Sequence, residues 1–163
     1  MILHRATLND IPAILFLERL AESQRYVGQW SEERHRATLA GADARYYVAY
    51  EEDGAPAAYV ILRGLAETSG SLDLKRIVVA QPGKGLGRQI LNEILHIAFD
   101  ELGAHRLFLD VFDDNARARH LYESLGFQYE GIMRESAERD GVWHDLHLMS
   151  MLQSEYAARK TPQ

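Results

Sequence analysis

The alternation of apolar and polar residues predicts that short strands and amphipathic helices succeed one another along the chain. A strand covers about residues 2–6, and a helix with Asn9 and Asp10 at its N-terminus runs to about residue 22. Ser31 is followed by two glutamates and begins a second helix, because acidic side chains are favourable at the positive end of a helix. Residues 25–30, between the two helices, form an aromatic-rich loop.

The next part of the chain is rich in β-forming residues. Two runs, residues 46–51 and 57–65, are joined through Glu52-Asp53-Gly54. The Asp-Gly dipeptide supplies the positive φ angles that a tight hairpin turn requires. A third run, residues 72–79, alternates at first and ends in the apolar Ile77-Val78-Val79. This region therefore predicts a hairpin followed by a strand with a buried end.

The second half of the chain changes from hairpins to a β-α-β unit and back. Its elements in chain order are a helix after the glycine-rich segment 83–87, a strand over 106–112, a helix from Asp113 and Asp114 to about 125, and strands over 127–133 and 142–152. The full order predicts an α/β (α+β) fold with a mixed, mostly antiparallel twisted sheet flanked by helices. We expect a single domain over residues 1–158 and a frayed tail over 159–163.

Composition limits the class of protein. The chain has 163 residues, no cysteine and a formal net charge of −6. The acidic excess argues against a nucleic-acid partner, and the missing cysteine excludes disulfides, thiolate metal ligands and an enzyme thiol. No signal peptide is visible, and no apolar run reaches the roughly 20 residues that span a bilayer. We therefore expect a cytoplasmic protein with no membrane partner.

A glycine-rich segment lies between the strand that ends at Val79 and the following helix. Gly83, Gly85 and Gly87 allow consecutive backbone N–H groups to turn toward one point, and Lys84 and Arg88 add positive charge there. Together with the free N–H groups at the helix start, they form a site suited to phosphate. The alternative is a purely structural turn between the strand and the helix.

The spacing of this segment narrows the choice of phosphate ligand. A Walker loop needs Ser or Thr after its lysine, and here Gly85 follows Lys84. A dinucleotide loop has the spacing Gly-x-Gly-x-x-Gly, whereas this segment reads Gly-x-Gly-x-Gly. An NAD(P)-dependent oxidoreductase remains an alternative on these grounds.

Two motifs together resemble a known family. The first is Gln81-Pro-Gly-Lys-Gly-Leu-Gly-Arg88, and the second runs from Leu109-Asp-Val-Phe-Asp-Asp-Asn-Ala-Arg through His120-Leu-Tyr-Glu-Ser-Leu-Gly-Phe127. Their order and separation resemble the GCN5-related N-acetyltransferases, closest to the bacterial group with ribosomal-protein and polyamine acetyltransferases. Pro82 stands where that family has Arg or Gln, and proline offers no N–H group.

The resemblance implies that acetyl-CoA is the co-substrate. Main-chain groups of Ile77 and Val79 would pair with the pantetheine arm, and the N–H groups of Gly83, Lys84, Gly85, Leu86, Gly87 and Arg88 would hold the pyrophosphate. Asn115 would contact the pantetheine region, while its alternative is a place at the helix start. A non-catalytic acyl-CoA sensor is a second alternative to an enzyme.

The implied reaction is direct acetyl transfer to a primary amine in a ternary complex. Tyr122 would protonate the departing thiolate, and its alternative is core packing with Ala118 and Leu125. Asp73 is our candidate base, and its alternative is a solvent-facing strand residue. His144 and His147 point to opposite faces of a strand, so we expect no metal. The acceptor is a small-molecule amine or a protein N-terminus, and the resemblance is compatible with a homodimer.

Overall fold

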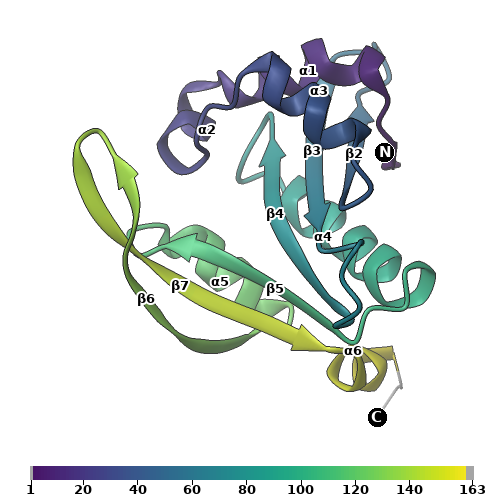
Figure 1. Ribbon diagram of the computed structural model, residues 1–163, viewed down its shortest axis with the longest axis vertical. Coiled ribbons are helices and arrows are strands. Elements are labelled where there is room, and N and C mark those ends of the chain that lie inside the picture. Colours follow the sequence, from purple (N-terminus) through teal and green to yellow (C-terminus); the bar gives the residue numbers. More distant parts are fainter. Residues whose placement is uncertain (1, 161–163) are drawn as a thin grey trace. The chain divides into compact units, whose positions relative to one another are not determined.

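The computed structural model describes residues 2–160, apart from the side chains of Ala21 and Glu22, as two compact units (Figure 1). One unit combines residues 1–69 with 74–94, and the other combines 70–73 with 95–163. Strand β4 (Ser71–Val79) and helix α4 (Leu86–His96) each contribute residues to both. The prediction of a single domain over 1–158 stays a prediction.

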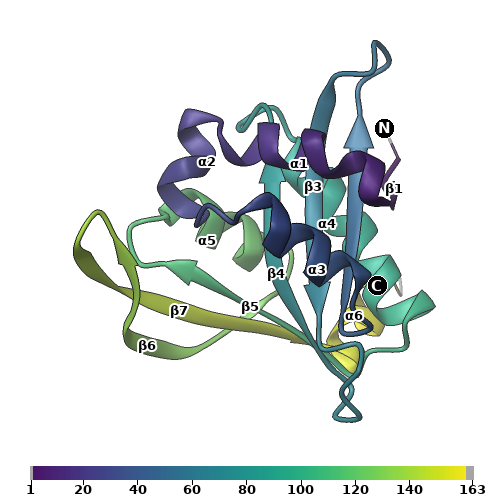
Figure 2. The ribbon, with the colours of Figure 1, turned by 45° about the horizontal axis from the view of Figure 1, so that its top comes forward.

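The first unit holds the N-terminal helices and the first strands. Before β4 and α4 its elements are β1 (His4–Arg5), the 3₁₀ helix η1 (Leu8–Asp10), α1 (Ile11–Glu18), α2 (Ala21–Tyr26), α3 (Glu32–Ala40), β2 (Ala44–Tyr50) and β3 (Pro56–Arg63). Helices α1 and α3 lie on one face of β2 and β3, and α4 lies on the other face (Figure 2). Because helices cover both faces, most residues of β2 and β3 are buried.

The second unit holds the rest of the chain. Its elements are the π-helix η2 (Ile97–Glu101), β5 (Arg106–Phe112), α5 (Ala116–Ser124), β6 (Gln128–Arg139), β7 (Val142–Leu152) and α6 (Gln153–Lys160). The strand order is β1-β2-β3-β4-β5-β7-β6. Strand β5 pairs in parallel with β4 over Ser71–Asp73, while the pairs β1–β2, β2–β3, β5–β7 and β6–β7 are antiparallel. The predicted mixed, mostly antiparallel sheet flanked by helices is confirmed.

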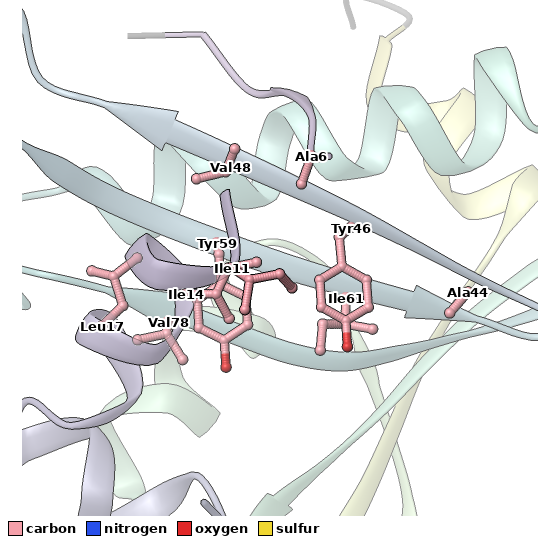
Figure 3. Close-up of a cluster of buried hydrophobic side chains, with 10 residues drawn as sticks. All are labelled: Ala6, Ile11, Ile14, Leu17, Ala44, Tyr46, Val48, Tyr59, Ile61 and Val78. Atoms are coloured by element: carbon pink, nitrogen blue, oxygen red, sulfur yellow. The ribbon is translucent and has the colours of Figure 1, made fainter. Parts of the chain in front are cut away.

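An apolar cluster fills the space between α1 and the sheet of the first unit (Figure 3). Ile11, Ile14 and Leu17 of α1 are fully buried, at the helical spacing that places them on one face. Tyr46 of β2 and Tyr59 of β3 complete the cluster, and their hydroxyl groups point the same way (Figure 3). That direction leads to buried charged groups, described below.

The first predicted helix is broken in two. Thr7 is the N-cap of η1 and accepts a hydrogen bond from the N–H of Asn9 at 3.3 Å, so the prediction of Asn9 as a cap was wrong. Asp10 is the N-cap residue of α1, as predicted, although its side chain makes no capping hydrogen bond to that helix. Leu20 is extended between α1 and α2, and the Gln24 side chain donates to the carbonyl of Arg19 at 3.1 Å. This bond satisfies a carbonyl at the end of α1. Helix α2 takes up part of the predicted loop over 25–30.

Two further element ends differ from the prediction. Asn115 caps α5, while the carboxylate of Asp113 lies 3.4 Å from Nδ1 of His144 on β7 and that of Asp114 pairs with Arg139 of β6. The predicted tail begins inside α6, and residues 161–163 lie outside the described residues. Buried Tyr156, stacked on Phe99 with ring centroids 4.9 Å apart, holds α6 in place.

Candidate active site

The glycine loop between β4 and α4 has the backbone conformation that the sequence predicts. Gly83 and Gly85 have φ angles of +85° and +84°, in the left-handed region that favours glycine. A Cβ atom at either position would meet no heavy atom within 4 Å. Backbone conformation, and not crowding, therefore requires glycine at these two positions, and the space around the loop is open.

The loop leads directly into the N-terminus of α4. The carbonyl of Gly85 accepts from the N–H of Gln89 at 3.2 Å, so the helical hydrogen bonding of α4 begins at Gly85, and the backbone N–H groups of its first turn lie next to the loop. Lys84 donates to the side chain of Gln81 at 2.6 Å, which keeps its ammonium on the loop. Backbone donors, helix dipole and cation together favour an anion here.

The end of β4 carries the two residues whose main chain was assigned to the pantetheine arm. Ile77 and Val79 are both half-buried, and their spacing of two places their side chains on one face of the strand. Asp73 shares that alternation, near the start of the same strand, and is also half-buried. It lies level with Phe108 of β5, in the second unit.

Asn115 is the N-cap of α5 in the second unit. Its side-chain oxygen accepts from the N–H of Ala118 at 3.2 Å, and the residue is half-buried. The structural alternative for this residue, a place at the helix start, is therefore what the structure shows. A capping oxygen still leaves the side-chain amide donors of Asn115 for a ligand.

Tyr122 lies in the last turns of α5 and is 7% exposed. Its ring meets that of Phe127 edge-on, with centroids 5.7 Å apart. Burial and the negative charge of Asp110 raise the pKa of Tyr122 well above its ordinary value, so the phenol is protonated at neutral pH. Within residues 2–160, no hydrogen bond to its hydroxyl is seen. The ring of Tyr122 is therefore packed in the core, as the structural alternative requires. Its hydroxyl also keeps the proton that it would need to protonate the departing thiolate.

Sequence reasoning missed a buried polar cluster in the first unit. Glu18 of α1 is 1% exposed and pairs with the guanidinium of Arg76 on β4. The hydroxyl of Tyr59 donates to Glu18 at 2.5 Å, and Nε2 of His35 lies 3.2 Å from the same carboxylate oxygen. Tyr46 meets Nδ1 of His35 at 3.1 Å.

The electrostatics of this cluster favour an ionised carboxylate. Burial raises the pKa of Glu18, but the nearby His35, the hydrogen bond from Tyr59 and the charge of Arg76 outweigh it, so the pKa is lowered overall. The signal in the sequence was a charged residue at an inward-facing position. Arg76 shares the alternation of buried Leu74 and Val78 on β4, where an apolar residue is the ordinary choice.

The described residues contain neither a metal-ligand cluster nor a helix that could span a membrane. Across residues 2–160, no group of three or more His, Asp or Glu side chains could hold a metal ion. His144 lies near Asp113 and Arg139, and His147 lies near Arg119. No helix in this range has the length and apolar character of a membrane span.

Comparison with known proteins assigns the class. The sequence model of the acetyltransferase (GNAT) family matches residues 14–127, so the chain belongs to that family, as its two motifs predicted. Spermidine N(1)-acetyltransferase of Vibrio cholerae is 37% identical over 86 residues, 52% of this chain and 50% of that protein. The chain therefore matches about half the length of that relative. The Escherichia coli K12 spermidine N(1)-acetyltransferase is 27% identical over 165 residues, 94% of this chain and 87% of that one.

Solved structures agree with the fold. A mutant form of spermidine N-acetyltransferase SpeG from V. cholerae superposes with a TM-score of 0.85 at 26% identity, covering 99% of this chain and 100% of that chain. A further SpeG structure, in complex with manganese ions, has a TM-score of 0.83 at 26% identity, covering 98% of this chain and 96% of that chain. The predicted family and fold class are both confirmed.

Proposed function

We propose that this chain transfers the acetyl group of acetyl-CoA to a primary amine by direct attack in a ternary complex. The observation that carries the proposal is the glycine loop over 83–88, which opens onto the N-terminus of α4 in a member of the GNAT family. That loop supplies donors for a pyrophosphate without any side-chain carboxylate nearby in sequence. We also propose a cytoplasmic location for the protein.

The cofactor is held mainly by backbone groups. The N–H groups of Gly83, Lys84, Gly85, Leu86, Gly87 and Arg88 bind the pyrophosphate, and Pro82 contributes none. The pantetheine arm lies along the end of β4 and exchanges hydrogen bonds with the main chain of Ile77 and Val79, as an added strand does. Asn115 offers its amide donors to the same arm.

The reaction needs one base and one acid. An acceptor ammonium with a pKa near 10 must lose its proton first, which costs about 4 kcal/mol at pH 7. Asp73 is the proposed base for that proton, directly or through water. The amine nitrogen then bonds to the thioester carbonyl carbon and gives its second proton to water as the carbon–sulfur bond breaks. The thiolate takes the proton of the Tyr122 hydroxyl, and Asp73 releases its proton to solvent. Acetylated amine and CoA thiol leave, and solvent returns a proton to Tyr122.

The acceptor we propose is a small-molecule amine. Two relatives act on spermidine according to their names, and a third, 34% identical over 79 residues, is an L-methionine sulfoximine/L-methionine sulfone acetyltransferase of Salmonella typhimurium. A relative from Bacillus subtilis named as a putative ribosomal N-acetyltransferase, 25% identical, keeps a protein N-terminus as the second candidate. Whether the chain forms a homodimer stays a prediction.

A thiol-release assay tests the proposal. Purified protein is mixed with acetyl-CoA and a panel of polyamines, amino acids and N-terminal peptides, and free CoA thiol is followed with time. We expect amine-dependent release with at least one small amine, and a melting temperature raised by acetyl-CoA more than by NADH or ATP. A larger shift with NADH would favour the oxidoreductase alternative. Tight acetyl-CoA binding with no turnover on any amine would favour the acyl-CoA sensor.

A further inference from the structure

The loop over residues 27–31, between α2 and α3, is tied to Glu18. The backbone N–H of Trp30 donates to Glu18 Oε2 at 3.3 Å, and the side chain of Gln29 donates to the Glu18 carbonyl at 2.6 Å. Both oxygens belong to the last residue of α1, which is buried. The position of this loop therefore depends on the position of one carboxylate-bearing residue.

Two guanidinium groups lie over the Trp30 ring. The central carbon of Arg76 lies 4.2 Å from the ring centroid, and that of Arg34 lies 3.9 Å from it. Arg76 is 8% exposed and is fixed by its ion pair with Glu18, so it is a rigid platform for the indole. Glu18 therefore contacts Trp30 in two ways: directly, by accepting from the backbone N–H of Trp30, and indirectly, through Arg76.

Arg76 immediately precedes Ile77 on the strand to which we assign the cofactor. If the pyrophosphate lies at residues 83–88 and the pantetheine arm follows Val79 and then Ile77, the thioester end comes level with Arg76. An amine that attacks the thioester must approach at that level. Trp30, which is half-buried, packs on Arg76 at that level of the first unit.

Stability alone does not account for this arrangement. A buried ion pair is weak evidence for stability, because desolvation of both charges offsets their attraction, and apolar side chains of similar volume often serve as well. What the charged pair provides here is a fixed geometry, since it orients the arginine plane on which Trp30 lies and the carboxylate that holds the loop backbone.

We propose that Glu18 and Arg76 are positioning residues for the acceptor amine, acting through Trp30 and the loop over 27–31. This inference rests on the proposed function and deepens it. Loss of the Glu18 charge should release the loop and weaken acceptor binding, while acetyl-CoA binding, which depends on the backbone of 77–88, should remain.

The matched control is Tyr46→Phe. The Tyr46 hydroxyl belongs to the same buried cluster through His35, whose ring centroid lies 5.4 Å from that of Trp30, but it takes part in neither hydrogen bond that holds the loop over 27–31 to Glu18. Both Glu18→Gln and Tyr46→Phe remove a buried hydrogen bond, so both lower the melting temperature. A role limited to stability would give them the same kinetics, whereas positioning would separate them.

The experiment combines steady-state kinetics with hydrogen exchange. For Glu18→Gln we expect the acceptor KM to rise roughly tenfold, the size expected for loss of a charged hydrogen bond. The acetyl-CoA Kd should stay within twofold, and amide exchange over 27–31 should accelerate. Tyr46→Phe should leave the acceptor KM and that exchange unchanged. Trp30→Ala, which removes only a half-buried side chain, should raise the acceptor KM by the same factor. The double variant Glu18→Gln/Trp30→Ala should raise the acceptor KM no further than either single variant does.

The outcomes separate this inference from the proposed function. If wild-type protein transfers acetyl groups but Glu18→Gln and Tyr46→Phe share one acceptor KM, positioning is wrong and the acetyltransferase proposal stands. If Glu18→Gln does not fold, Trp30→Ala decides alone, and an unchanged acceptor KM there overturns the inference. If wild-type protein acetylates no amine, both proposals fail, whatever the exchange data show.

Discussion

Two buried tyrosines, one in each compact unit, use their hydroxyl groups in opposite ways. Tyr59 is fully buried, and its hydroxyl donates to the ionised carboxylate of Glu18. Tyr122 is 7% exposed, packs on Phe127, and has no hydrogen bond at its hydroxyl within residues 2–160. Burial raises the pKa of both phenols, and a nearby carboxylate, Glu18 or Asp110, raises it further.

The difference teaches which buried hydroxyl is available for chemistry. A phenol that already donates to a carboxylate satisfies a buried charge, and its removal leaves that charge one donor short. A phenol with an open hydroxyl contributes to folding mainly through its ring. We therefore assign Tyr59 to stability and Tyr122 to proton transfer, and variants of the two should behave in opposite ways.

The largest effect that we expect is a loss of turnover in the Tyr122→Phe variant. The ring and its contact with Phe127 remain, so the melting temperature should change little. Loss of the proton donor should lower turnover about 10²-fold, the lower end of the range for a general acid, because a thiolate leaves more easily than an amine. Rates at saturating acetyl-CoA, measured beside a thermal melt, check this. Full activity in a stable variant would leave water as the proton source.

The next largest effect that we expect is a lower free energy of unfolding in the Tyr59→Phe variant. Glu18 would lose a hydrogen bond in a buried site, which costs about 1–3 kcal/mol of unfolding free energy. Turnover at saturating acceptor should stay within about twofold, since the hydroxyl takes no part in proton transfer. Urea unfolding and steady-state kinetics on the same preparation give both values. A collapse of turnover with unchanged stability would reverse the comparison.

A smaller effect concerns pH. The pKa of Glu18 is lower in the folded protein than its ordinary value of 4.5, so its contribution to stability is present above pH 4.5 and is lost as pH falls through the folded pKa. Glu18→Gln removes this titration. The fall in unfolding free energy from pH 5 to pH 3 should therefore be shallower in the variant than in wild type. Parallel curves would mean that Glu18 titrates alike in both states.

Much of this architecture could be predicted because its signals are local. The strand over 106–112 and the strand over 142–152 have the predicted bounds, since each is a β-rich run between turn residues. The Asp-Gly turn at 53–54 also forms as predicted, with a φ of +84° at Gly54, and a second Asp-Gly pair, at 140–141, has a φ of +76° at Gly141. The glycine loop falls in the same category, because its conformation depends on residue type alone.

The parts that could not be predicted depend on partners far away in the chain. The end of helix α1 at Glu18 is one example, because the buried side chain of Glu18 pairs with Arg76, which lies 58 positions later in the chain. Asn115 is the cap of α5, while Asp114 pairs with Arg139. Helix α6 forms around Tyr156, whose hydroxyl donates to Asp100 at 2.7 Å. Hydrophobic periodicity carries no information about such pairings.

Titration of acetyl-CoA into wild-type protein and Gly87→Glu, side by side in a calorimeter, tests the central claim most directly. Gly87 lies in the first turn of α4, where a glutamate is favourable for the helix but places a side chain and a negative charge at the pyrophosphate. We expect Gly87→Glu to have an unchanged melting temperature without ligand and an acetyl-CoA affinity lowered by about tenfold or more. Equal affinity in a folded Gly87→Glu protein would contradict it, because the pyrophosphate would then be held elsewhere.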